Sequence, residues 1–173
     1  MKLMTALAVC AALAGAGAAV AAAPPPKRPF DESRMAGRWY ELARTPTSMN
    51  RGCEAGWVDW TAAGAERFHF LAGCHRGGVD GPVKQVTGQV RVIDPVSHNK
   101  VKMSVFGGLV SREYWLLDHG EDYGWLIMGT ADGRYVAVMT ARRRPSEQIR
   151  TQALERLAAL GYEKSKLEFP PQT

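Results

Sequence analysis

The side chains that could carry chemistry in this chain are four histidines and three cysteines. His69, His75, His98 and His119 do not follow the spacing of a metal-binding motif. No Ser/His/Asp or paired-carboxylate arrangement accompanies them. The sequence therefore predicts no catalytic residues, no metal site and no cofactor, and an enzyme is the least favoured functional class.

Two of the cysteines flank a predicted hairpin. If the hairpin is symmetric about Ala63 and Gly64, Cys53 and Cys74 face each other across two antiparallel strands. Opposed Cβ atoms are then about 4.5–5.5 Å apart, and a small adjustment brings them to disulfide distance. Because the chain also carries an export leader, described below, a disulfide is favoured over two free thiols.

Large apolar side chains are the other candidates, because they could line a cavity for an apolar molecule. Trp57 and Trp60 are three residues apart, so only one of them can easily face inward from a strand. For each candidate, plain core packing is an equally good interpretation. The predicted lining residues are Trp57, Trp60, Phe70, Tyr114, Leu116 and Trp125.

The elements that must position these side chains are short strands. Val86, Val90 and Val92 share one face of a strand with Gly88. About eight such segments follow one another from Gly37 to Thr140, joined by short turns and without a helix between them. This pattern predicts an all-β antiparallel barrel or sandwich, and closure into a barrel would remove the exposed edges.

After Pro145 the period of the apolar residues changes to that of a helix, which we place at about 146–160. Ser146 is a suitable N-cap and Gly161 a natural stop. A single helix cannot enter a packed barrel, so its apolar stripe must cover the outside. This explains why a strand such as Glu113-Tyr114-Trp115-Leu116-Leu117 is apolar on both faces.

The N-terminus has the layout of a cleaved signal peptide. Lys2 precedes an apolar run rich in alanine, and Ala19-Val20-Ala21 supplies a small-x-small cleavage pattern. Lipid attachment at Cys10 is the less favoured alternative. The predicted organisation is a signal peptide at 1–22, a proline-rich arm at 23–33, a barrel with its helix at 34–169 and a tail at 170–173.

The formal net charge of +5 is modest. Part of it lies in Arg142-Arg143-Arg144, and no long basic stripe follows, which argues against nucleic acid as a partner. A solvated run at a strand end is the simplest interpretation. A basic patch would also suit an anionic membrane surface or ligand head group.

Several segments resemble the lipocalin family, most closely its bacterial outer-membrane lipocalin and apolipoprotein D group. Gly37-Arg38-Trp39-Tyr40-Glu41-Leu42-Ala43-Arg44 resembles the opening motif of that group. Tyr114-Trp115-Leu116-Leu117-Asp118 and Asp122-Tyr123-Gly124-Trp125-Leu126-Ile127 resemble its sixth and seventh strands, and Leu160-Gly161-Tyr162-Glu163-Lys164-Ser165-Lys166-Leu167 resembles the end of its helix. Gly37 and Trp39 then belong to a structural motif at the closed end. The family also has an arginine that covers this tryptophan, and the resemblance assigns it to Arg142. By register the position is Ala141, so either a bulge corrects the shift or Arg142 does not cover Trp39.

The resemblance implies an eight-stranded up-and-down barrel that holds a small hydrophobic ligand. We expect a fatty acid, a lysophospholipid or a similar lipid, carried or stored in the cell envelope by a monomer or dimer. The expected location is periplasmic or secreted, with anchoring to the outer membrane through Cys10 as the alternative. A filled barrel that serves as an interaction or inhibitor module is the second functional class.

Overall fold

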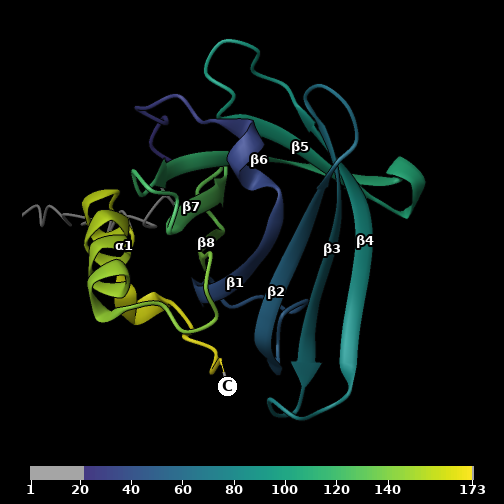
Figure 1. The fold of residues 1–173 in the computed structure, drawn as a ribbon. Coiled ribbons are helices and arrows are strands. Elements are labelled where there is room, and N and C mark those ends of the chain that lie inside the picture. The colour runs from purple at the N-terminus through teal and green to yellow at the C-terminus, as the bar shows by residue number, and fades with distance from the viewer. Residues whose placement is uncertain (1–21, 173) are drawn as a thin grey trace, which may run out of the picture.

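The computed structural model describes residues 22–172, which form a closed antiparallel barrel (Figure 1). Each strand pairs with the next, and β8 pairs with β1 to close the ring. The strands are β1 (Gly37–Arg44), β2 (Cys53–Ala62), β3 (Arg67–Arg76), β4 (Val83–Val92), β5 (Lys100–Val105), β6 (Val110–His119), β7 (Trp125–Thr130) and β8 (Val136–Thr140). The predicted fold class is confirmed, and it is the barrel and not the sandwich.

The alternation of side chains gives the wall two apolar faces. The inward cluster fills the barrel and includes Trp60, Phe68 and Leu116. The outward cluster, which includes Ile127 and Val138, lies beneath helix α1 (Glu147–Ala159). Strands β7 and β8 are buried along their whole length because both of their faces are covered.

Helix α1 begins where the sequence predicts. The Ser146 hydroxyl accepts a hydrogen bond from the backbone N–H of Ile149, as an N-cap does. Ala153, Leu154 and Leu157 are its buried residues, and they face the barrel wall. The helix thus lies outside the barrel, to the left of β7 and β8 in Figure 1.

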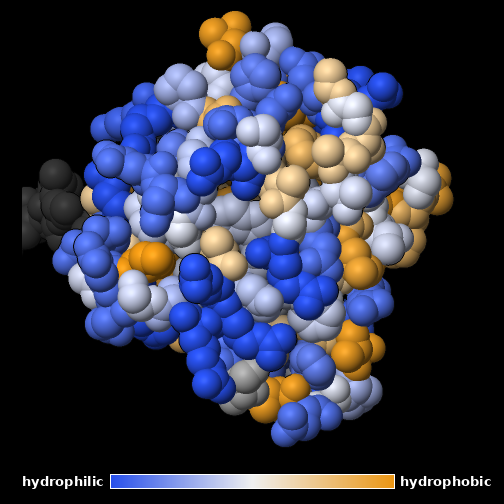
Figure 2. Space-filling view, in the orientation of Figure 1, coloured by the Kyte–Doolittle hydropathy of each residue, from blue (hydrophilic) through white to orange (hydrophobic). Residues whose placement is uncertain are grey.

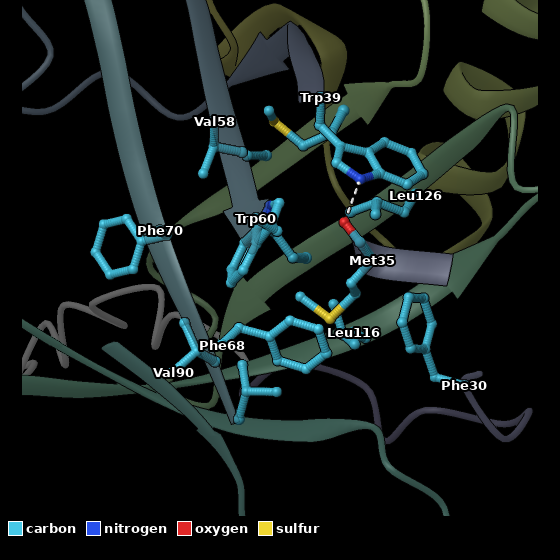
Figure 3. Packing of buried hydrophobic residues seen from close by; sticks show 14 of the residues in the cluster. Phe30, Met35, Trp39, Val58, Trp60, Phe68, Phe70, Val90, Leu116 and Leu126 are labelled. Atoms are coloured by element: carbon cyan, nitrogen blue, oxygen red, sulfur yellow. Dashed lines mark hydrogen bonds between the residues drawn. The ribbon is translucent and has the colours of Figure 1, made fainter. Parts of the chain in front are cut away.

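One end of the barrel is closed by the short 3-10 helix η1 (Glu32–Met35), drawn in purple at the upper end in Figure 1. The indole Nε1 of Trp39 donates a hydrogen bond to the Met35 carbonyl over 3.0 Å (Figure 3). Phe30 and Met35 are buried in the inward cluster next to it. Trp39 therefore has the structural role at the closed end that the sequence predicts.

Among the cation–π contacts of the described residues, none places Arg142 over Trp39. Arg142 is exposed, and its carbonyl accepts a hydrogen bond from the Thr140 hydroxyl. Among the described residues, the cation–π contacts in this region place Arg143 over Tyr40 and Arg38 over Trp57. The register of β8 explains this. Arg142 lies two positions after Thr140, the last residue of β8, so it has the parity of the outward-facing residues of that strand.

The Cys53–Cys74 disulfide is present, but the expected register of its hairpin is wrong. Trp60 pairs with Phe70 and Ala62 with Phe68, so the hairpin is centred nearer Ala65 than between Ala63 and Gly64. A bulge between Glu54 and Trp57 then shifts the pairing again, which leaves Cys53 opposite Arg76. The two cysteines are diagonal neighbours with a Cα–Cα distance of 5.4 Å, well within disulfide range.

The C-terminal tail completes the wall where β1 and β2 separate. These strands pair only between Gly37–Tyr40 and Trp57–Trp60. Beyond that point Arg44 pairs with Glu168, and the Ala55 N–H donates to the Pro171 carbonyl over 2.9 Å. The Gln172 side chain donates to the carbonyls of Glu41 and Gly56.

The predicted signal peptide and the alternative lipid site at Cys10 lie outside the described residues, apart from Ala22. Within residues 22–172, no helix combines the length and the apolar character needed to cross a membrane.

Candidate functional site

The candidate site is the inward face of the barrel toward its mouth, the end opposite η1. Strands β3, β5 and β6, together with Tyr135 just before β8, contribute half-buried apolar side chains there, whereas those nearer η1 are mostly fully buried. The half-buried inward residues toward the mouth are Ala72, Met103, Val105, Tyr114 and Tyr135. The rings of Tyr114 and Tyr135 meet edge to face, with centres 6.2 Å apart. This region offers an apolar surface that a ligand could cover.

Four of the six predicted lining residues face inward. Trp60, Phe70 and Leu116 are buried in the inward cluster, and Tyr114 packs against that cluster from the mouth side. Figure 3 shows Trp60, Phe68 and Leu116 gathered in the interior, and the ring of Phe70 has its centre 6.0 Å from that of Trp60. The first three belong to the filled part of the barrel, so Tyr114 is the predicted residue nearest to open space.

Trp125 lies on the other side of the wall. It belongs to the outward cluster beneath α1, while its neighbour Leu126 faces inward. The expectation that Trp125 lines the interior is therefore wrong. The strand is apolar on both faces, so its composition does not distinguish the interior from the surface beneath the helix.

Trp57 also points outward, as its separation from Trp60 requires. The Arg38 guanidinium lies over its ring at 5.5 Å, and the His75 ring lies 5.7 Å away. A Cβ added to Gly73 would come within 2.5 Å of the Trp57 ring, so this tryptophan lies flat on the backbone of β3. Trp57 packs on the outer wall and is excluded as an interior lining residue.

Two cations on the inward face of the mouth were not among the predicted site residues. Lys84 pairs with Cys74 and shares the face of Val86 and Val90. Arg112 pairs with Met103 and shares the face of Tyr114. Both side chains belong to exposed residues. The alternation of β4 places Lys84 on this face, because Lys84 lies two residues before Val86.

A buried ion pair also lies at this end. Arg44 donates hydrogen bonds to the Glu41 carboxylate, to Glu168 and to the carbonyls of Asn50 and Cys53. Burial raises the pKa of Glu41, and the charge of Arg44 opposes that rise without cancelling it. Since each guanidinium nitrogen of Arg44 donates a hydrogen bond, this pair holds β1, the tail and the β1–β2 loop together and does not offer a free cation to a ligand.

The tyrosine hydroxyls near the mouth stay protonated. Burial raises the pKa of Tyr114, although the charge of Arg112 and its hydrogen bond oppose the rise. Burial also raises the pKa of Tyr135, and the negative charge of Glu41 adds to the effect. Both hydroxyls can therefore donate a hydrogen bond across the physiological pH range.

A hollow of about 1060 Å³ lies along β2, β3, β4 and the turn Phe106–Gly108. The hollow is lined by consecutive residues of each strand, so both inward-facing and outward-facing side chains of the barrel wall contribute to it. Apart from Leu71, the outward side chains that line it are polar, which makes this groove a poor site for an apolar ligand. They include Asp59, Thr61, His69, Gln85, Thr87 and Gln89.

No group of three or more His, Cys, Asp or Glu side chains that could hold a metal ion occurs within residues 22–172. Two of the histidines are held by backbone carbonyls. The His75 ring contacts the Gly81 carbonyl and the His119 ring contacts the carbonyls of Gly120 and Pro29. His98 pairs with Glu32. These contacts give the three histidines structural roles.

Comparison with known proteins agrees with this architecture. The chain is 28% identical to temperature-induced lipocalin-1 of Arabidopsis thaliana over 149 residues, which cover 81% of this chain and 78% of that protein. It is 27% identical to apolipoprotein D of Macaca fascicularis over 95 residues, or 54% of this chain and 48% of that protein, so it spans about half of this second relative.

Solved structures with the same fold include insecticyanin from the tobacco hornworm Manduca sexta, with a TM-score of 0.65 and 16% identity over 86% of this chain and 84% of that one. The cockroach allergen Per a 4 gives a TM-score of 0.66 and 16% identity over 89% of this chain and 96% of that one. The family model of the lipocalin-like domain matches residues 30–172. The chain therefore belongs to the lipocalin-like family.

Proposed function

We propose that this protein binds one small anionic amphiphile, with the apolar chain of the ligand inside the mouth half of the barrel and its head group near Lys84 and Arg112. The observation that carries the proposal is that both cations share the inward face with the half-buried apolar residues of the mouth. Membership of the lipocalin-like family supports the coarser statement that the ligand is small and hydrophobic.

The energetics favour a lipid chain over a compact polar ligand. Each buried CH₂ group contributes about 0.8 kcal/mol. The cations and the Tyr114 and Tyr135 hydroxyls would add little total energy at an exposed mouth, but they would fix the orientation of the ligand. A fatty acid or a lysophospholipid has both parts.

We place this activity in the cell envelope, as storage or transport of the ligand. The support is the signal-peptide layout of residues 1–22. A cleaved leader would give a periplasmic or secreted protein, and acylation at Cys10 would give an anchored one.

A filled barrel that serves as an interaction module is the second candidate. It is favoured by the closed half of the barrel, where Trp60, Phe68, Phe70 and Leu116 are all at most 6% exposed. If the mouth half closes over its own side chains in the same way, no room is left for a ligand.

Displacement of a fluorescent fatty acid by palmitate and by 1-hexadecanol separates these candidates. The double variant Lys84→Gln/Arg112→Gln should bind palmitate about tenfold more weakly, or about 1.4 kcal/mol. Its affinity for the uncharged alcohol should hardly change. Lys102→Gln is the matched control, because Lys102 lies in the same region on the outward face, opposite Glu113.

Failure of the wild-type protein to bind either compound would reject the carrier proposal in favour of the filled barrel. Equal loss of both compounds in the double variant would reject the role of the two cations.

A further inference from the structure

The turn between β5 and β6 exposes an unusual amount of apolar surface. Leu109 is 88% exposed, Phe106 68% and Val110 56%. We call Phe106–Val110 the mouth turn. It projects from the wall at the right of Figure 1, where Figure 2 shows apolar atoms at the edge of the molecule. Single exposed apolar residues are ordinary, but three within five consecutive residues form a patch that calls for a partner.

The backbone of the mouth turn is strained at its first residue. Phe106 has φ 52°, and Gly107 and Gly108 follow with φ 67° and 97°. Glycine adopts such angles freely, whereas a bulky residue in the left-handed region is unfavourable. Phe106 stays mostly exposed, so burial within the described fold does not compensate for an aromatic side chain at this position.

The apolar surface continues onto the free end of β4. Strand β5 ends at Val105, opposite Gly88, so residues 83–87 have no partner in β5. Val83 on the outward face and Val86 on the inward face of that stretch are also among the exposed apolar residues. The patch therefore follows the rim of the barrel mouth on the side where β5 stops.

Cations lie along this rim, with Asp80 and Asp132 as exposed acidic residues of the neighbouring turns. Lys84 lies between Val83 and Val86, and Lys102 and Arg112 lie on the two strands that carry the mouth turn. Glu113 is the acidic residue in the exposed parts of those strands. Apolar side chains at a tip with basic residues behind them match the layering of an anionic bilayer, in which acyl chains lie beneath charged head groups.

We propose that the mouth turn docks the protein on an anionic lipid bilayer, with Phe106 and Leu109 inserted among the head groups. This goes beyond ligand binding, because it names a surface and a partner separate from the interior. A second copy of the chain is a weaker occupant. A stable interface needs about 800 Å² from each partner, which a projecting five-residue turn does not supply.

The test is co-sedimentation of the purified chain, without its leader, with vesicles of phosphatidylcholine alone or with phosphatidylglycerol added. The variant Phe106→Asn/Leu109→Ser removes both apolar tips, and asparagine tolerates a positive φ, so the fold is retained. Val96→Ser is the matched control, since Val96 is also 88% exposed but lies on the β4–β5 loop at the closed end.

We expect the wild-type chain and Val96→Ser to bind the anionic vesicles alike, and the double variant to bind about tenfold or more weakly. Binding should fall with added salt and with phosphatidylglycerol omitted. No binding by the wild-type chain, or equal losses in the control and the double variant, would overturn the proposal.

Palmitate affinity, measured on the same samples, keeps the two proposals apart. The affinity for palmitate should be unchanged in Phe106→Asn/Leu109→Ser. The docking proposal can therefore be rejected while ligand binding is retained, and ligand binding can be rejected while docking is retained. Sedimentation velocity without lipid tests the alternative that a second copy of the chain binds to the mouth turn. A wild-type dimer that the double variant abolishes would assign the mouth turn to a second copy and overturn bilayer docking.

Discussion

At the scale of single residues, Asp118 connects three parts of the chain. Its carboxylate accepts a hydrogen bond from Arg28 of the N-terminal arm over 2.6 Å and two from Arg156 of α1 over 2.5 and 2.8 Å. The side chain itself is only 4% exposed. Burial acts to raise the pKa of Asp118, but the hydrogen bonds from Arg28, Arg156 and the His119 N–H outweigh it, and the pKa is lowered.

Asp118→Asn should therefore lower the free energy of unfolding by about 2 kcal/mol at pH 7, less than for a fully buried pair because both arginines are half exposed. A lowered pKa in the folded state stabilises the fold above the unfolded value of about 3.9. That contribution is lost as the pH falls through the folded pKa. Urea unfolding from pH 7 to pH 3 should show the two proteins converging in acid.

Asp59→Asn is the control for this prediction. Asp59 accepts two hydrogen bonds from Arg38, over 2.7 and 2.6 Å, but this pair lies at the surface. The cost should stay below about 1 kcal/mol. If both variants lose the same stability, burial of Asp118 is not what makes its contacts important.

The sequence predicted correctly which side of the barrel wall a residue lies on where the spacing along one strand was enough to decide it. The separation of Trp57 and Trp60 predicted their opposite faces, and the structure has Trp60 inside and Trp57 outside. It failed at Trp125, because a strand with two apolar faces gives no signal for which face meets the helix. The alternation of side chains along β4 would have assigned Lys84 to the inward face, but a lysine at the end of a strand is also typical of a position exposed to solvent.

At the scale of elements, the β2–β3 hairpin shows why pairing can be predicted and register cannot. The Cys53–Cys74 disulfide could be predicted because two cysteines remain after the predicted signal peptide, and disulfides are typical of exported proteins. The register depends on the turn at Gly64, Ala65 and Glu66, where Glu66 has φ 57°, and on the bulge at Ala55, where φ is 47°. Neither residue type marks a left-handed position in a sequence, so a symmetric hairpin was the simplest and incorrect assumption.

Cys53→Ser/Cys74→Ser should reduce the free energy of unfolding by about 3 kcal/mol, because the disulfide closes a loop with a sequence separation of 21 residues. Chemical denaturation of the oxidised wild type and the double variant measures this. The wild type after reduction should match the variant. A loss below about 1 kcal/mol would mean that the unfolded chain gains little freedom from opening this loop.

The sequence reveals the C-terminal tail only in part: Lys166-Leu167-Glu168-Phe169 suits a short strand, and Glu168 does form a bridge with Arg44, but the partner of this segment could not be predicted. Glu168, Pro171 and Gln172 bind backbone groups of β1 and β2 where those strands separate. The pattern Phe169-Pro170-Pro171 has no strand period and indicates only an extended tail. Its place in the wall depends on the gap left by β1 and β2, which is a tertiary feature.

At the scale of the whole molecule, the fold followed from the sequence because short strands, one late helix and few connections leave few alternatives. Closure could not be derived from alternation, since a sandwich has the same pattern. The resemblance to lipocalins decided between them. The structure adds an asymmetry between the two ends, with one end plugged by η1 and Trp39 and the other lined by half-buried residues and cations.

The central claim is that the mouth half of the barrel interior is the ligand site, and Ala72 offers the most direct test of it. Ala72 faces inward between Val58 and Val86, whereas its neighbour Leu71 points outward. Ala72→Trp would fill the mouth half with an indole, and Leu71→Trp would add the same group to the outer wall. Circular dichroism checks that both variants remain folded.

Native mass spectrometry of the three proteins, titrated with palmitate, is therefore the decisive measurement. We predict one palmitate per chain for the wild type and for Leu71→Trp, and none for folded Ala72→Trp. A folded Ala72→Trp that binds palmitate as the wild type does, or a wild type that binds none, would contradict the interior site.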